Sequence, residues 1–331
     1  MIDMDGLIEE FSGLTNNEAF LRAFTDRVLL LNPDPDFEDP FLGNTQRRDF
    51  LPHLVDMVSS LREDGHTRRI FDLGAGKGEI VDLVLDERAP VGTRVSIEEP
   101  NPNLMQRYVH RIERSQRLQL GDVFHGDVQS MYHLDLPAEQ DLVLAIHMVY
   151  HLTDWRCASA DPAEDLRTMV GFSYGLLRPG GRLFLVYADQ TRALAGLVGL
   201  YFYRTRWAKD PSLARDLARI YRARNSLLAD GGIVPELAIQ YPDRPAEIEV
   251  HRLPSMFYGK TLADLAAMSL VGELIGADDE PFELDKLVAA GEFLSRHGAE
   301  VGLRRDDEPG PRQGMWCADQ PQVVVIITRT R

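Results

Sequence analysis

From about residue 67 onward, short apolar runs alternate with longer segments of helical periodicity. Runs typical of buried strands occupy six segments: RRIFDLG (68–74), TRVSIEEP (93–100), LVLAIHMVY (142–150), RLFLVYAD (182–189), EIEVHRL (247–253) and VVVIITR (323–329). A weaker strand signal lies near residues 121–127. Strands that alternate with helices usually form a parallel sheet with helices on both faces. The pattern therefore predicts an α/β fold with a seven-stranded, mostly parallel sheet.

The N-terminal part of the chain has a different pattern. Residues 1–66 have helical periodicity, interrupted by the proline-rich and acidic segment NPDPDFEDPF (32–41), which suits a surface loop. Two further helical segments, at about 191–235 and 260–298, interrupt the later strands, and DDEPGPRQG (306–314) predicts a loop. We therefore expect an N-terminal helical cap over 1–66 and a domain over 67–331 that carries two helical insertions.

Charge restricts the class of partner. The 331 residues carry a formal net charge of −16, with a pI near 5.0. Because no basic field is present to hold a phosphate backbone, nucleic acid is not expected as a partner. A small neutral or cationic molecule fits this charge better, and the sequence does not predict the oligomeric state.

The ends and the apolar runs of the chain predict a cytoplasmic protein with no membrane partner. The N-terminal MIDMDGLIEEF is acidic where a signal peptide would be basic and then apolar. The run ALAGLVGLYFY (193–203) is too short to span a bilayer. Cys157 and Cys317 lack the spacing of metal ligands or of a disulfide framework, and we predict no metal site.

The stretch FDLGAGKGEI (71–80) places three glycines directly after the first predicted strand. A nucleoside-triphosphate loop would end in Gly-Lys-Ser/Thr, but Lys77 is followed by Gly78 and Glu79. The dinucleotide fingerprint G-x-G-x-x-G also matches poorly. An Asp-x-Gly-x-Gly-x-Gly turn suits the amino-acid and ribose portions of S-adenosylmethionine, because bare backbone lets a polar ligand approach closely.

Acidic residues follow the second and third strands. Glu98 and Glu99 lie about 25 residues after the glycines, where a carboxylate can accept hydrogen bonds from ribose hydroxyls. Since side chains alternate across a strand, we expect only one of the pair to face the ligand, and we select Glu99 at the tip. In HGDVQ, Asp127 and Val128 suit the adenine, although Asp127 is also a plausible helix N-cap.

These segments, together with DLVLAIHMVYHLTDW and LLRPGGRLFLVYAD, resemble the successive motifs of class I S-adenosylmethionine-dependent methyltransferases. The series covers about residues 67–190 and implies a Rossmann-like fold. Within that superfamily, GAGKGEI, the Glu-Pro after the second strand and HMVYHLTD resemble the branch of histamine N-methyltransferase and its bacterial relatives.

The resemblance implies S-adenosylmethionine as the cofactor and places Gly74 and Gly76 against its methionine part, Glu99 on its ribose and Ile146 against its adenosine. The full set of implied cofactor-binding residues is Asp72, Gly74, Ala75, Gly76, Glu99, Pro100, Asp127, Val128 and Ile146.

Where the histamine enzyme has a glutamine, this chain has His147. A histidine at the carboxyl end of the fourth strand can take a proton from an ammonium, a hydroxyl or an indole nitrogen. We therefore predict His147 and Tyr150 as catalytic residues, with the alternative that His147 only packs there. The predicted substrate-binding residues are Phe20, Phe24, His147, Tyr150 and His151.

The predicted activity is methyl transfer to a small molecule at an amine or another heterocyclic nitrogen. Methylation of an indole carbon is an alternative within the same branch. A protein of another class, which binds S-adenosylmethionine without catalysis, would keep the glycines and Glu99, so the sequence leaves it open. A dehydrogenase is disfavoured by the failed dinucleotide fingerprint.

Overall fold

The computed structural model describes residues 4–32, 41–61, 66–152, 161–206, 210, 212–271 and 280–331. Its main sheet has seven strands in the order β3-β2-β1-β4-β5-β10-β6. The strand bounds are β1 Arg69–Leu73, β2 Thr93–Glu98, β3 Leu118–Phe124, β4 Gln140–Ile146, β5 Leu177–Ala188, β6 Ala246–Leu253 and β10 Gln322–Arg329. Only β10 runs antiparallel to its neighbours, β5 and β6. The predicted seven-stranded, mostly parallel, Rossmann-like sheet is confirmed.

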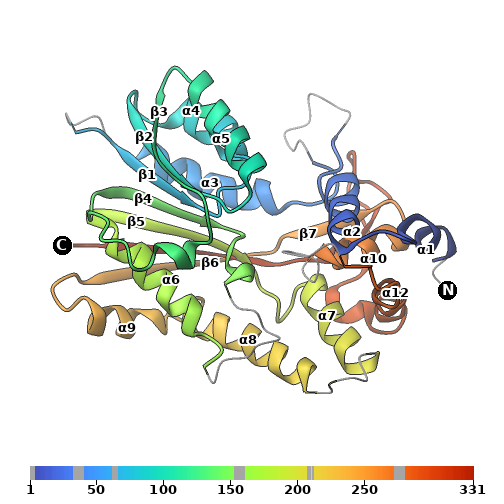
Figure 1. Ribbon diagram of the computed structural model, residues 1–331. Coiled ribbons are helices and arrows are strands. Elements are labelled where there is room, and N and C mark those ends of the chain that lie inside the picture. Colours follow the sequence, from blue (N-terminus) through green and yellow to red (C-terminus); the bar gives the residue numbers. More distant parts are fainter. Residues whose placement is uncertain are drawn as a thin grey trace.

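Helices cover both faces of this sheet, as Figure 1 shows. On one face α3 Gln46–Ser59, η2 Val81–Leu85, α4 Asp86–Arg88 and α5 Pro102–Arg114 lie over a core that includes Ile70 and Leu144. The opposite face carries η3 Val128–Met131, α6 Glu164–Gly175 and α9 Ile233–Gln240 over Phe71 and Val143. Both faces of the central sheet are buried, which explains why β1, β4 and β10 and the second half of β5 are largely apolar.

The helices at the N-terminus pack with helices that follow later strands. α1 Asp5–Phe11, α2 Asn16–Ala23 and η1 Phe24–Val28 share an apolar core with α7 Leu194–Thr205, α10 Leu262–Ser269 and α12 Asp285–His297. We call these six elements the helix cluster. α7 begins six residues after the carboxyl end of β5, so the cluster lies beside the end of the sheet where the parallel strands finish (Figure 1).

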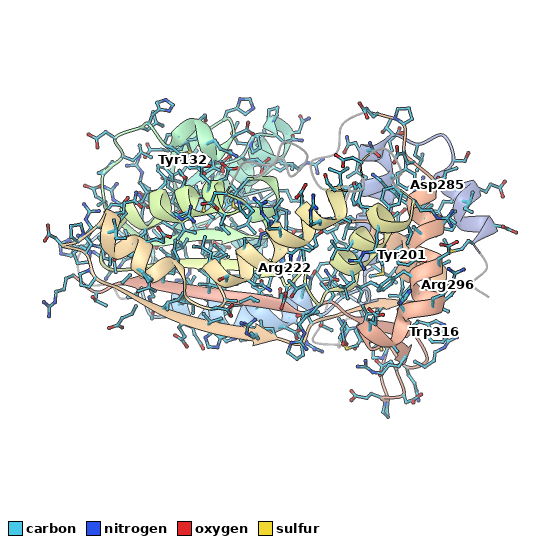
Figure 2. The ribbon with its side chains drawn as sticks, turned by 90° about the horizontal axis from the view of Figure 1, so that it is seen from below. Tyr132, Tyr201, Arg222, Asp285, Arg296 and Trp316 are labelled. Atoms are coloured by element: carbon cyan, nitrogen blue, oxygen red, sulfur yellow. The ribbon has the colours of Figure 1, made fainter. Side chains whose placement is uncertain are left out.

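Within the cluster α7 and α12 lie side by side. Tyr201 of α7 contacts Phe293 of α12 with ring centroids 5.7 Å apart, and its hydroxyl donates to Glu292 Oε2 at 3.4 Å. Figure 2 labels Tyr201 on α7 and Arg296 on α12 at this end of the molecule. Helices from the N-terminus and from both insertions thus pack together around one apolar core.

α3 belongs to the sheet, although it precedes residue 66. Its buried residues Phe50, Leu54 and Val58 pack on the sheet face, away from α1 and α2. The insertion after β5 comprises α7, α8 Leu213–Leu227 and α9, and so continues to Gln240. The division of the chain at residue 66 stays a prediction.

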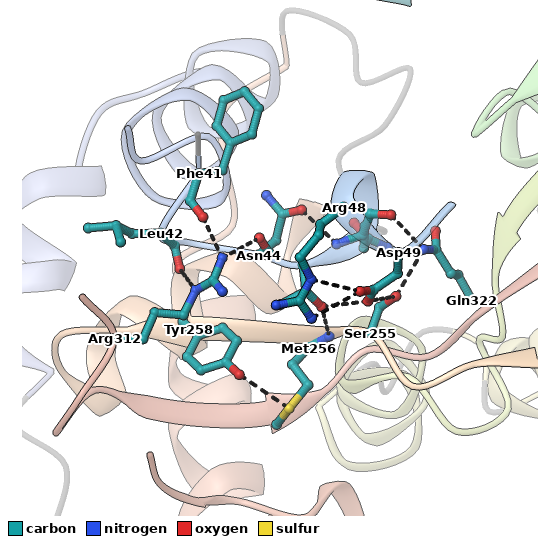
Figure 3. Close-up of polar contacts among 12 residues, drawn as sticks. Phe41, Leu42, Asn44, Arg48, Asp49, Ser255, Met256, Tyr258, Arg312 and Gln322 are labelled. Atoms are coloured by element: carbon teal, nitrogen blue, oxygen red, sulfur yellow. Dashed lines mark hydrogen bonds and ion pairs between the residues drawn. The ribbon is translucent and has the colours of Figure 1, made fainter. Parts of the chain in front are cut away.

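A segment at 41–49 joins the helix cluster to α3 and is fixed by polar contacts (Figure 3). Arg312 Nε donates to Leu42 O at 3.0 Å, and its Nη2 donates to Asn44 O at 3.1 Å and to Phe41 O. Ser255 Oγ donates to Asp49 Oδ2 at 2.7 Å. We call residues 41–49 the junction segment.

A small antiparallel sheet, in the order β7-β9-β8, was not predicted. Its strands are β7 Met256–Gly259, β8 Arg304–Arg305 and β9 Trp316–Asp319, and η6 Gly298–Val301 precedes β8. Strands of two to four residues are too short to show a period of two, so the hydrophobic pattern cannot reveal them. The predicted loop over 306–314 lies between β8 and β9.

Two strand boundaries differ from the prediction. The fourth strand ends at Ile146 because His147 adopts a φ of +55°, after which η4 Val149–His151 turns the remaining apolar residues into the core. The weak strand runs over Leu118–Phe124, earlier than 121–127. Among the described residues, no helix combines the length and the apolar character needed to cross a membrane.

Candidate functional site

The glycine turn after β1 requires left-handed backbone. Gly74, Gly76 and Gly78 have φ values of +60°, +57° and +75°. A Cβ at Gly78 would lie 2.6 Å from the Tyr108 ring, whereas a Cβ at Gly76 would meet nothing within 4 Å. Gly78 therefore packs against α5, while Gly76 presents bare backbone to open space.

Both glutamates at the end of β2 reach the glycine turn with their carboxylates. Glu98 Oε2 accepts a hydrogen bond from Gly74 N at 2.8 Å, and Glu99 Oε2 accepts one from Gly76 N at 2.7 Å. Alternation fails because β2 ends at Glu98, so Glu99 lies outside the pleated strand. Glu99 Oε1 also accepts from Asn101 N at 2.8 Å, and Asn101 caps α5.

A third carboxyl, that of Asp72, belongs to the second-last residue of β1 and lies near Glu98 and Glu99. Asp72, Glu98 and Glu99 are 3%, 2% and 6% exposed. Burial raises the pKa of Asp72 to about 7, the charges of Glu98 and Glu99 add to the rise, and the Tyr108 hydroxyl opposes it. Burial likewise raises the pKa of Glu98 to about 7, against the hydrogen bond from Gly74 N. In the part of the chain that the structure describes, no Lys, Arg or His nitrogen lies within 4 Å of these three carboxylates.

The other implied cofactor residues are distributed around this turn. Ala75 N donates to Glu98 O at 2.9 Å, and Pro100 is exposed directly after Glu99. Asp127 is exposed at the N-cap position of η3 but makes no side-chain cap hydrogen bond, while Val128 is buried below it. Ile146, at the end of β4, is partly buried.

The turn after β4 contacts the turn after β1. A Cβ at Gly74 would lie 2.5 Å from Met148 Cβ, so only glycine allows this approach. His147 precedes Met148, and its ring contacts Phe50 with centroids 6.1 Å apart. Left-handed backbone at a non-glycine residue costs free energy, of the order of 1–3 kcal/mol, and is often retained at functional sites.

The two ring nitrogens of His147 have different surroundings. Nδ1 lies 3.2 Å from the Tyr150 hydroxyl, which also accepts a hydrogen bond from Ala188 N. Nε2 is buried and has no hydrogen-bond partner in the described part of the chain. Burial lowers the pKa of His147 to about 4, with a further contribution from the charge of Arg47 and an opposing one from Gln322. His147 is therefore uncharged at neutral pH, and Tyr150 fixes the orientation of its ring.

The predicted substrate residues do not form one group. The rings of Phe20 and Phe24 stack with centroids 5.4 Å apart and pack against the apolar core of the helix cluster. Tyr150, the partner of His147, packs instead against the core on one face of the sheet. The prediction for His151 concerns a side chain outside the described part of the chain. Glu79 forms ion pairs with Arg47 and with Lys77, the latter at 2.9 Å, as expected of a helix carboxylate.

Sequence reasoning missed two buried polar residues near His147. Gln322 begins β10, is fully buried, and donates through Nε2 to Gln46 O at 2.7 Å and to Ser255 Oγ at 2.9 Å. Arg224 of α8 is 7% exposed, lies 5.3 Å from the Tyr150 ring centroid and donates to Gln190 Oε1. A polar residue before the apolar run of β10, and an arginine on the apolar face of α8, are the only sequence signals for them.

The residues at the turn fit a cationic ligand such as S-adenosylmethionine. The open backbone at Gly76 leaves room for the ligand, and the three buried carboxyls can supply negative charge there. No group of three or more His, Cys, Asp or Glu residues suited to a metal ion occurs in the described ranges. A separate cavity of about 200 Å³ lies between η1 and the turn from β7 to α10, where Arg27 already pairs with Glu10 and Asp264.

Comparison with known proteins gives the fold a context. No protein-family model and no curated protein matches the chain. Among solved structures, a candidate methyltransferase from Bacillus halodurans is similar over 84% of this chain and 97% of its own, with 12% identity and a TM-score of 0.49. The plantazolicin methyltransferase BamL, in complex with a triazolic desmethylPZN analog and SAH, covers 99% and 100% at 10% identity and a TM-score of 0.42. The [4+2]-cyclase SpnF covers 96% and 99% at 14% identity and 0.41.

These likenesses are distant, so the fold assignment rests on the strand order itself. Six parallel strands, with the antiparallel β10 inserted between β5 and β6, form a Rossmann-like sheet. In open α/β sheets, ligands bind beyond the carboxyl ends of the strands, where the glycine turn and His147 lie.

Proposed function

We propose that the protein transfers a methyl group from S-adenosylmethionine to a small neutral or cationic molecule, at an amine or another heterocyclic nitrogen. The observation that carries the proposal is the glycine turn, on which Gly76 is open and both Glu98 and Glu99 accept hydrogen bonds from backbone N–H groups. When bound, the cofactor supplies an electrophilic methyl on a sulfonium with a neutral leaving group.

The chain's own residues supply position and polarity. Glu99 holds the ribose, and Gly74 and Gly76 allow close approach of the methionine part, while Ile146 contacts the adenosine. Alignment of the acceptor with the methyl accounts for much of such a rate, about 7–11 kcal/mol of barrier in well-oriented systems. The helix cluster, beside the end of the sheet, excludes water from the reacting groups.

His147 is proposed to face the acceptor and to assist its deprotonation, with Tyr150 orienting the imidazole through Nδ1 at 3.2 Å. Because its pKa is lowered to about 4 by burial, His147 is in the proton-accepting form throughout the neutral range. It is a weak base, so it can take a proton only once formation of the new bond has made the acceptor's N–H more acidic.

The experiment also has to distinguish two alternatives. An indole carbon is the acceptor in the first, and in the second the protein binds the cofactor without methyl transfer. The experiment is to measure S-adenosylhomocysteine released from S-adenosylmethionine in the presence of a panel of amines and indoles. Release that depends on an amine supports the proposal, and release that depends only on indoles, with the methyl found on carbon, supports the first alternative. No release with any acceptor, despite cofactor binding, contradicts the proposal and favours the second.

A further inference from the structure

Glu98 is the unexpected member of the carboxyl group at the glycine turn. The ribose role proposed for Glu99 needs only one carboxylate, yet Glu98 reaches Gly74 N at 2.8 Å and is 2% exposed. A buried carboxylate without a compensating cation is costly, because the charged form loses its hydration. A carboxylate retained here, two residues along the turn from the open backbone at Gly76, favours a positively charged ligand.

The protein balances the negative charge of the two glutamates to different extents. Glu99 accepts hydrogen bonds from two backbone N–H groups, those of Gly76 and Asn101, and so its charge is partly balanced by the protein. Among the described residues, Glu98 accepts a hydrogen bond only from Gly74 N, and the carboxyls of Asp72, Glu99 and Asp127 lie near it. The negative potential left for a ligand is therefore greatest next to Gly74.

We infer that Glu98, supported by Asp72, makes the site selective for the sulfonium cofactor over its uncharged thioether product, and that sulfonium binding releases protons from this carboxyl pair. The inference rests on the proposed function. S-Adenosylmethionine and S-adenosylhomocysteine share the adenosine and amino-acid portions and differ by the methyl group and the charge on sulfur. Only an electrostatic element of the site can use that charge to distinguish them.

The proton balance follows from the same charges. Since burial raises the pKa of Asp72 and of Glu98 to about 7, the pair is partly protonated at neutral pH. A bound cation favours the ionised carboxylates, and the released protons pass to the buffer. Affinity for the sulfonium cofactor then rises as pH increases from about 6 to about 8, more steeply than affinity for the thioether.

The test is isothermal titration calorimetry of the wild-type protein with each ligand at pH 6, 7 and 8, in two buffers of different ionisation enthalpy. We expect tighter binding of S-adenosylmethionine, with greater proton release. In Glu98→Gln, the preference for S-adenosylmethionine over S-adenosylhomocysteine should fall on the order of tenfold. Glu99→Gln should weaken both ligands by similar factors, and Glu113→Gln, at an exposed carboxylate of α5, should change neither.

The possible outcomes distinguish failure of this inference from failure of the proposed function. If neither ligand binds the wild-type protein, the proposed function is wrong. Binding of both ligands with equal proton release, or with a preference that Glu98→Gln leaves unchanged or Glu99→Gln reduces equally, overturns the inference and leaves the function standing. The proton measurement needs no variant, so it remains decisive if Glu98→Gln does not fold.

Discussion

At the residue scale, Gly76 is the position where backbone geometry and ligand access coincide. Gly76→Val should abolish measurable cofactor binding, because a branched side chain would fill the open space that the glycine leaves and would strain a φ of +57°. Gly180→Val is a matched control, since Gly180 has a φ of +77° and also has nothing within 4 Å of its Cβ position. Both variants should lose similar stability in chemical denaturation. Calorimetry that finds undiminished cofactor affinity in Gly76→Val would contradict the placement.

His147 is the second residue for which we predict a specific effect of substitution. His147→Gln should lower turnover by about 10²–10⁴-fold, the usual contribution of proton abstraction, with cofactor affinity nearly unchanged. In the wild-type protein, protonation of His147 should reduce turnover only as the pH falls through about 4, because His147 is uncharged above that value. His110→Gln, an exposed substitution on α5, is the control. Turnover within about threefold of the wild-type value, with an unaltered pH profile, would make His147 part of the pocket wall.

The residues that the sequence predicted best are those whose role depends on backbone and order along the chain. Glycines after a first strand and an acid after the second follow from local motif spacing, and Gly74, Gly76, Glu98 and Glu99 indeed meet at one turn. The approach of Gln322 to His147 could not be predicted, because the two residues are 175 positions apart and meet through the antiparallel insertion of β10. Phe20 and Phe24 were selected by residue type alone, which carries no information on where a cap packs.

At the scale of elements, the junction segment connects the helix cluster to α3. Arg312 is 6% exposed and donates to three backbone carbonyls of residues 41, 42 and 44. Arg312→Met should lower the free energy of unfolding by about 3 kcal/mol, because buried carbonyls would lose charged donors. Arg305→Met, which removes an arginine stacked on Trp316 at 4.3 Å on the surface of the small sheet, should cost less than about 1 kcal/mol.

The Arg312→Met variant also tests whether the helix cluster affects turnover without affecting cofactor binding. Since Arg312 contacts the junction segment and not the glycine turn, cofactor affinity should persist in Arg312→Met while turnover falls. Denaturation curves give the first quantity, and calorimetry and the methyl-transfer assay give the others. An unchanged denaturation midpoint would show that these hydrogen bonds do not hold the junction, and a loss of cofactor affinity equal to the loss of turnover would contradict the separation.

At the scale of the whole molecule, the sheet provides one ligand edge and the helix cluster lies beside it. The sheet could be predicted because seven apolar runs alternate with helical segments. The packing of α1 and α2 against α7, α10 and α12 could not, because amphipathic faces do not specify their partners across more than 150 residues. The net charge of −16 agrees at this scale with the carboxyl-rich turn, since both favour a cationic ligand.

The most direct test of the central claim, an S-adenosylmethionine site at the glycine turn, is the melting temperature of the intact protein with S-adenosylmethionine, S-adenosylhomocysteine, NAD or no ligand. A ligand at 100 times its dissociation constant stabilises the folded state by about 2.7 kcal/mol, which is visible as a rise in melting temperature. We predict a rise with S-adenosylmethionine and a smaller rise with S-adenosylhomocysteine, both lost in Gly76→Val, and none with NAD. A rise with NAD alone, or no rise with either adenosyl ligand, would contradict the account.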